Sequence, residues 1–151
     1  MKKPLLLLLA LAAAPLHAGE ALDTASASRF LQDFYQAVQQ RDEAKISAVL
    51  AEDAPIRLTL LKNAQTFTLS RADWLQQLRA AAHFGKTPRI TLDGFTLSLT
   101  QAGYSGTLHF HKRETGEMLD QKLRVDEDVE ADLRVEDDRL KITGLRIRSS
   151  F

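Results

Sequence analysis

Hydrophobic positions in the first third of the chain repeat with the period of an amphipathic helix. Between residues 28 and 40, Phe30, Phe34 and Val38 recur every four residues, and polar side chains fill most of the positions between them. This spacing predicts a helix with one broad apolar face. A second helical pattern starts after Asp42, which can cap it. Because only about one residue separates the two predicted helices, we expect them to pack against each other as a helical hairpin.

The period then changes from helical to twofold. Apolar and polar residues alternate over 56–60 and over 66–69, which predicts two short strands. Ser70 and Asp73 have the spacing of a capping box, so a third helix should start there. Gly85 is placed to end that helix.

Alternation of apolar and polar residues continues after Pro88 to the end of the chain and is typical of antiparallel sheet. We expect separate strands over 119–125 and 129–135, and a last strand over 140–147. The pair Asp93-Gly94 shifts the alternation by one residue, and a bulge explains the shift better than a hairpin turn. The order of elements indicates the α+β class, with three N-terminal helices and about six strands.

The N-terminus has the pattern of a secretory signal peptide. Lys2 and Lys3 precede an apolar run over 5–14, and the chain becomes polar after Ala18. A ten-residue run rises only about 15 Å as a helix, against about 30 Å for the hydrocarbon core of a membrane. We therefore expect residues 1–18 to be removed and residues 19–151 to form one domain, periplasmic or secreted, without membrane attachment.

Composition excludes several classes of function. The chain has no cysteine, which rules out disulfides, thiolate metal sites and cysteine nucleophiles. Removing Lys2 and Lys3 from the 20 basic residues leaves 18 against 20 acidic ones. A net charge of about −2 creates no field that would gather nucleic acid, so we expect no nucleic-acid partner.

Several segments resemble one known superfamily. An apolar helix over 34–42 is followed by Ile46-Ser47-Ala48-Val49-Leu50-Ala51-Glu52-Asp53-Ala54, and the capped helix at 70–78 and the closing strand at 140–147 complete the pattern. This order is similar to that of the NTF2-like superfamily, also described as cystatin-like or SnoaL- and ketosteroid-isomerase-like. The resemblance implies three helices packed on a curved antiparallel sheet that forms a cone around a pocket.

The ketosteroid isomerase site can be compared with this chain position by position. Aligning the family's acidic turn on Asp42 and its Asp-Ala pair on Asp53-Ala54 places the isomerases' oxyanion-hole tyrosine at Phe34 and their catalytic aspartate at Leu58. A phenyl ring donates no hydrogen bond and an isobutyl group moves no proton, so neither half of that mechanism is present. Tyr35 is the next residue, but a step of about 100° around the helix is expected to point it away from the pocket.

Apolar residues on the helices and the first strand are expected to line the pocket implied by the resemblance, although they could equally fill the core. The candidates are Phe30, Phe34, Leu58, Trp74 and Leu78.

The sequence favours a non-catalytic domain that binds a small apolar ligand or a protein partner, with a homodimer through the sheet as one form of such contact. The alternative is an isomerase-like, cyclase-like or dehydratase-like enzyme with a non-standard pocket. Its candidate proton carriers are Tyr35, Asp53, His83, His109 and His111. Convergence of two or more of them on one cavity would favour the enzyme.

Two patterns raise the question of a metal. His109 and His111 share one face of a predicted strand, but no third ligand is apparent. The eight acidic residues between 126 and 138 lack the calcium-loop pattern and alternate with apolar residues, as on the solvated face of a strand. We therefore expect no metal and no cofactor.

Overall fold

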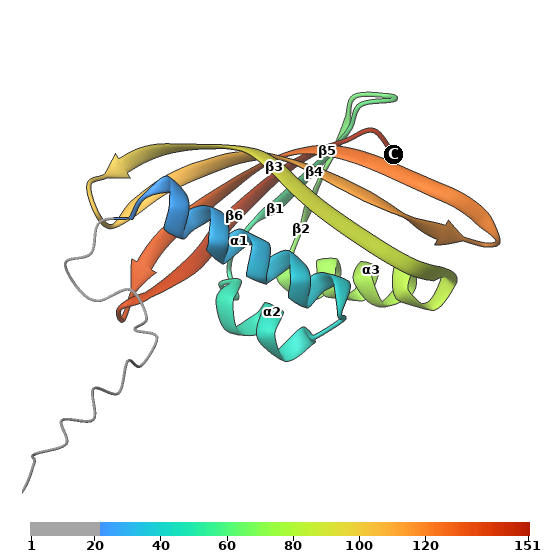
Figure 1. The fold of residues 1–151 in the computed structure, drawn as a ribbon, viewed down its shortest axis with the longest axis horizontal. Helices are drawn as coiled ribbons and strands as arrows, with labels where there is room; N and C mark the ends of the chain where they lie inside the picture. The colour runs from blue at the N-terminus through green and yellow to red at the C-terminus, as the bar shows by residue number, and fades with distance from the viewer. Residues whose placement is uncertain (1–21) are drawn as a thin grey trace, which may run out of the picture.

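The computed structural model describes residues 22–151, so the predicted signal peptide over residues 1–18 lies outside the described residues. Three helices pack against one six-stranded sheet (Figure 1). The helices are α1 (Thr24–Gln39), α2 (Glu43–Val49) and α3 (Arg71–Phe84). The strands are β1 (Ile56–Leu60), β2 (Gln65–Leu69), β3 (Gly85–Gln101), β4 (Ser105–Met118), β5 (Gln121–Glu136) and β6 (Arg139–Ser149).

The strands lie in the order β2-β1-β6-β5-β4-β3. This arrangement confirms the predicted α+β class and the six-stranded sheet, with one correction, because β1 and β6 run parallel and the sheet is mixed rather than antiparallel. The turn at 137–138 fixes the direction of β6 against β5, and β1 enters from α2 in the same direction as β6. Such a parallel neighbour cannot be read from the alternation of apolar residues alone.

Local signals in the sequence account for most element boundaries. Ser70 accepts a hydrogen bond from the Asp73 backbone, and Asp73 accepts one from Ser70, which confirms the predicted capping box of α3. The pairing of β3 with β4 shifts between Asp93 and Thr96, and Gly94 has a φ of +69°, so the predicted bulge is present.

One strand prediction is wrong. The two strands expected over 119–125 and 129–135 form a single strand, β5, because the buried side of the alternation continues from Val125 through Glu127 to Val129. A charged side chain at 127 therefore faces the interior.

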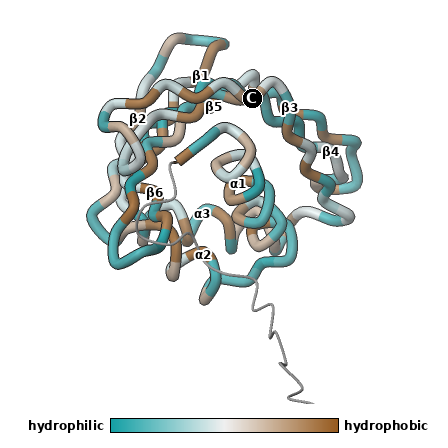
Figure 2. The backbone as a smooth tube through the Cα atoms, turned by 60° about the vertical axis from the view of Figure 1, so that its left-hand side comes forward, coloured by the Kyte–Doolittle hydropathy of each residue, from teal (hydrophilic) through white to brown (hydrophobic). Residues whose placement is uncertain are grey.

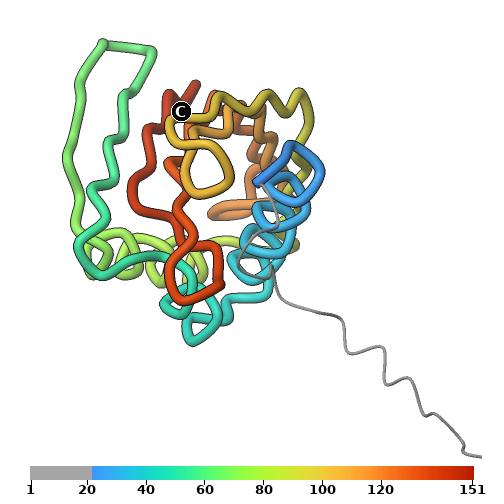
Figure 3. Tube along the Cα trace, turned by 90° about the vertical axis from the view of Figure 1, so that its left-hand side faces the viewer, coloured from blue at the N-terminus to red at the C-terminus, as the bar shows by residue number. Residues whose placement is uncertain are grey.

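The sheet curls around the helices, so that α1 lies inside its concave face (Figure 2). Phe34 and Tyr35 of α1 are buried there, and Tyr35 packs edge-to-face against Phe110 of β4 with 5.8 Å between ring centroids. The β1–β2 hairpin extends beyond the rest of the sheet (Figure 3). Among residues 22–151, no helix is both long enough and apolar enough to cross a membrane.

Candidate ligand-binding site

A cavity of about 250 Å³ lies at one end of the cone. It opens where the C-terminal ends of α1 and α3 and the start of α2 meet the beginning of β3 and the end of β4. Its wall is largely apolar and includes Val38, Ile46, Leu78, Pro88, Ile90 and Leu123.

Polar contacts hold the walls of this cavity in place. The Gln39 side chain at the end of α1 accepts a hydrogen bond of 2.9 Å from the Ile90 backbone of β3. Arg41 donates a bond of 3.4 Å to the Gly85 carbonyl, at the point where α3 passes directly into β3. A Cβ at Gly85 would lie 2.7 Å from the Ala81 carbonyl, so the turn requires glycine. These contacts join the end of α1 and the turn after it to the start of β3, and they fix the position of the cavity wall.

A buried group of charges lies behind the inner wall of the cavity. Lys112 of β4 and Glu127 of β5 are direct cross-strand partners, and the Lys112 Nζ is 2.7 Å from the Glu127 Oε1. The same Nζ is 3.2 Å from the Glu114 Oε2. Both side chains of the Lys112–Glu127 pair are about one-tenth exposed, so these two charges attract each other with little screening by water.

Tyr35 completes this group. Its ring centroid lies 5.4 Å from the Lys112 Nζ, within the range of a cation–π contact. Burial raises the pKa of Tyr35 well above its ordinary value, so its hydroxyl stays protonated. Burial alone would lower the pKa of Lys112, but the Glu127 carboxylate, together with Tyr35 and Glu114, raises it above its ordinary value. Lys112 therefore remains an ammonium ion.

Glu114 connects the buried charges to the cavity. Its side chain lines the cavity and is 32% exposed. Its Oε2 accepts the bond from Lys112, whereas its Oε1 makes no hydrogen bond within residues 22–151. The site therefore combines apolar walls with a carboxylate oxygen that can accept a bond from a ligand.

The five predicted pocket residues are divided between this wall and the core. Leu78 lies on the cavity wall. Phe34 and Trp74 are buried and stack on each other, with ring centroids 6.0 Å apart. Phe30 and Leu58 are partly buried against the core. The structure thus brings Leu78 to the cavity and uses the other four in packing.

Tyr35 does not line the cavity, and it is buried in the core beside Phe34. The apolar face of α1 is wide enough to bury both Phe34 and Tyr35, whose rings meet edge-to-face at 5.0 Å. Asp53 lies exposed in the turn before β1, and His83 is exposed near the end of α3.

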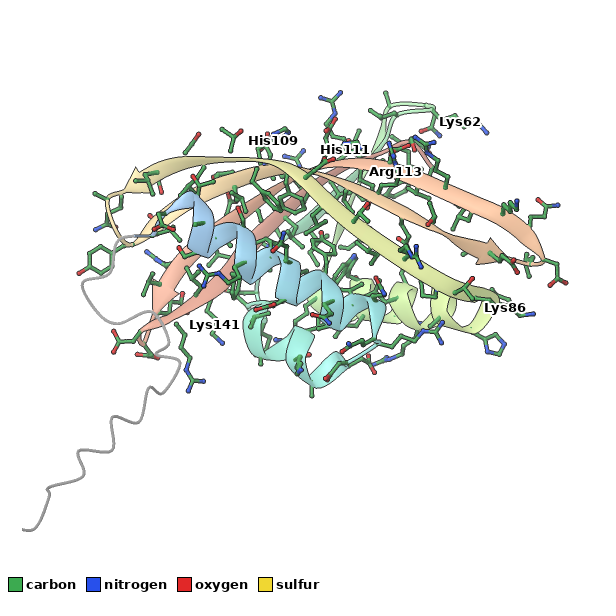
Figure 4. The ribbon with its side chains drawn as sticks, viewed as in Figure 1. Lys62, Lys86, His109, His111, Arg113 and Lys141 are labelled. Atoms are coloured by element: carbon green, nitrogen blue, oxygen red, sulfur yellow. The ribbon has the colours of Figure 1, made fainter. Side chains whose placement is uncertain are left out.

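His109 and His111 project from the outer face of the sheet (Figure 4). His111 lies between two carboxylates, 3.3 Å from Asp126 and 3.4 Å from Asp128. Within the part of the chain that the structure describes, no three potential ligands are grouped to hold a metal ion. The five candidate proton carriers therefore do not converge on one cavity.

Several acidic residues on the outer face of β5 form ion pairs with arginines of β4, β5 and β6. Asp126 accepts hydrogen bonds from Arg113 and Arg124, and Arg146 bonds to both Glu130 and Asp132. This pattern matches the solvated strand face expected from the sequence.

Sequence reasoning missed Lys112, Glu114 and Glu127. The alternation of inward-facing residues along this strand indicates their position, because Lys112 and Glu114 continue the two-residue spacing of Leu108 and Phe110. Charged residues in the buried phase of two adjacent strands indicate an internal polar site when they are brought opposite each other.

The three helices and the curved six-stranded sheet form an NTF2-like cone. The family model of the SnoaL-like domain matches residues 19–146, and this chain belongs to that family. None of the curated proteins matches the chain in sequence.

Solved structures with the same fold share little sequence with this chain. A candidate scytalone dehydratase from Novosphingobium aromaticivorans aligns with a TM-score of 0.68 at 10% identity, over 84% of this chain and 83% of that one. The hexachlorocyclohexane dehydrochlorinase LinA-type3 from Novosphingobium barchaimii aligns with a TM-score of 0.65 at 15% identity, over 85% and 90%. An NTF2-like protein from Cytophaga hutchinsonii aligns with a TM-score of 0.66 at 8% identity, over 85% and 99%. At these identities the likeness establishes the fold alone.

Proposed function

We propose that this protein binds a small, mainly apolar molecule in the cavity between α1, α2, α3 and the ends of β3 and β4. The observation that carries the proposal is the cavity itself, whose largely apolar wall includes the half-buried carboxylate of Glu114 next to the buried Lys112. Ligand sites commonly combine a concave apolar surface with a few polar groups that orient the ligand.

The volume of the cavity limits the size of its ligand. Small-molecule sites usually measure about 300 to 1,000 Å³, and the cavity of about 250 Å³ lies just below that range. A ligand of one or two fused rings fits this space better than a steroid does.

Filling the cavity tests the proposal. Ala82 of α3 lies on the wall, whereas Ala80, two residues earlier on the same helix, is exposed and does not line the cavity. We expect tryptophol (indole-3-ethanol) to bind the unmodified protein and Ala80→Phe in calorimetric titration, and Ala82→Phe to lose most of that binding while keeping its circular dichroism spectrum. Equal binding by both variants would place the ligand elsewhere and refute the proposal.

A second candidate is an isomerase-like, cyclase-like or dehydratase-like enzyme. The observation that favours it is the Glu114 carboxylate on the cavity wall, with the Lys112 ammonium 3.2 Å behind it as a counter-ion. A carboxylate in this position can take a proton from a carbon next to a carbonyl group. In a dehydration, the protonated Glu114 would then give that proton to the hydroxyl on the next carbon, whose C–O bond breaks as the C=C bond forms, and water leaves.

The two candidates can be distinguished with 4-hydroxy-4-phenylbutan-2-one, whose dehydration produces a conjugated enone that is followed by its absorbance. Enone formation above the buffer rate, lost in Glu114→Gln, would support the enzyme. Tryptophol binding without enone formation would leave ligand binding as the function supported.

We also propose that the protein is exported. The matched SnoaL-like region starts at residue 19, next to the expected cleavage point after Ala18, which is consistent with removal of the preceding residues. Mass spectrometry of the exported fraction is expected to find an N-terminus near Gly19. A membrane-bound chain that retains Lys2 and Lys3 would contradict the proposal.

A further inference from the structure

The polar groups around the cavity differ in whether they can accept a further partner. Lys112 directs its ammonium at Glu127 and Glu114, and the face of the Tyr35 ring lies near it. Lys112 does not line the cavity, and its ammonium is already paired with two carboxylates. Glu127, with its side chain 11% exposed, is likewise committed to Lys112.

The cations at the mouth of the cavity also have partners. Arg79 forms an ion pair of 2.7 Å with Glu43, and Lys86 lies 3.6 Å from Asp120. Arg41 donates to a backbone carbonyl. These contacts lie on the exposed side, where water and salt weaken the field of each charge.

Glu114 differs from these groups because it lines the cavity and its Oε1 makes no hydrogen bond among the described residues. Glu117, a more exposed carboxylate on the same wall, adds to the negative charge there. The inner group contains one ammonium, from Lys112, and two carboxylates, from Glu114 and Glu127, and therefore carries a net charge of −1. A second cation next to Glu114 would pair each carboxylate with one positive charge. An anion placed there would lie next to the Glu114 carboxylate and be repelled by the net negative charge of the group.

We propose that the cavity selects ligands with a protonated amine on an apolar body, and that the amine binds the Oε1 of Glu114. This inference rests on the proposed binding function and specifies its ligand class. An alkyl ammonium is charged at pH 7, and its hydrogen bond to a carboxylate is roughly twice as strong as one between neutral groups. Burial of the apolar body supplies the rest of the binding free energy.

Three indoles with different polar ends test this selection by calorimetric titration at pH 7. Tryptamine carries an ammonium, tryptophol a hydroxyl and indole-3-acetate a carboxylate on nearly the same body. We expect tryptamine to bind about tenfold more tightly than tryptophol, and indole-3-acetate to bind most weakly. In Glu114→Gln, tryptamine and tryptophol should bind within about a factor of two of each other, because the amide still accepts a bond from Lys112 and carries no charge.

The control variant is Glu136→Gln, which removes an exposed carboxylate at the far end of β5 and should leave the preference for tryptamine unchanged. Binding of tryptophol with no preference for tryptamine, or a preference that survives Glu114→Gln, would overturn this inference and leave the binding function intact. Failure of all three indoles to bind would overturn both.

Discussion

Replacing Lys112 with methionine is expected to destabilise the fold strongly, although it removes only one side chain. The Lys112 Nζ lies 2.7 Å from the Glu127 Oε1, and both side chains are about one-tenth exposed. At an effective dielectric constant of about 20, two unit charges at that separation attract by about 6 kcal/mol, and much of this offsets the cost of removing both ions from water. Methionine fills a similar volume but leaves the Glu127 carboxylate buried without its cation.

Removal of one partner of a buried ion pair typically costs about 3 to 5 kcal/mol. We therefore expect Lys112→Met to lower the free energy of unfolding by that amount in urea denaturation at pH 7. The double variant Lys112→Met with Glu127→Leu should recover most of the loss, because it removes both charges from the interior.

An exposed ion pair supplies the control for this experiment. Glu43→Gln breaks the contact with Arg79, whose side chain is 62% exposed, and should cost at most about 1 kcal/mol. A loss below about 1 kcal/mol for Lys112→Met, or a double variant no more stable than the single one, would show that this pair is not buried as described.

Three further predictions concern other parts of the molecule. Ser70→Ala should lower the free energy of unfolding by about 0.5 to 2 kcal/mol in urea, since it removes the cap of α3; an unchanged midpoint would refute this. The hydrogen bond from Arg113, with those from Arg124 and His111, lowers the pKa of Asp126 from 3.8 to about 2. This carboxylate therefore stabilises the fold above pH 3.8 and less as the pH falls toward 2; carbon-detected NMR titration should show this pKa, and Arg113→Ala should raise it. The protein should not isomerise a β,γ-unsaturated steroid ketone above background in an absorbance assay, because apolar side chains occupy the positions of the isomerases' donor and base; measurable turnover would contradict that alignment.

Local rules were sufficient to predict much of the fold. The period of the apolar residues gave the order of helices and strands, Ser70 and Asp73 marked the start of α3, and the Asp93-Gly94 pair marked the bulge in β3. Each of these features depends on residues close together in the sequence.

The candidate site could not be predicted in the same way, because it depends on contacts between distant segments. The expected strands over 119–125 and 129–135 left out Glu127, and a charged residue in a buried position costs free energy unless a partner is present. That partner, Lys112, is supplied by the register of β4 against β5. The cavity likewise depends on where the end of α1 meets the start of β3, and the bond from Ile90 to Gln39 joins segments far apart in the chain.

The location of bound tryptophol tests the account most directly. With 13C-labelled methyl groups, nuclear Overhauser effects from the indole protons should reach the methyls of Ile46, Leu78 and Ile90, which share the cavity wall. Leu61 and Leu99 are exposed elsewhere and should show none. Contacts confined to those exposed leucines, or no contacts to the wall at saturating tryptophol, would contradict the claim that this cavity is the binding site.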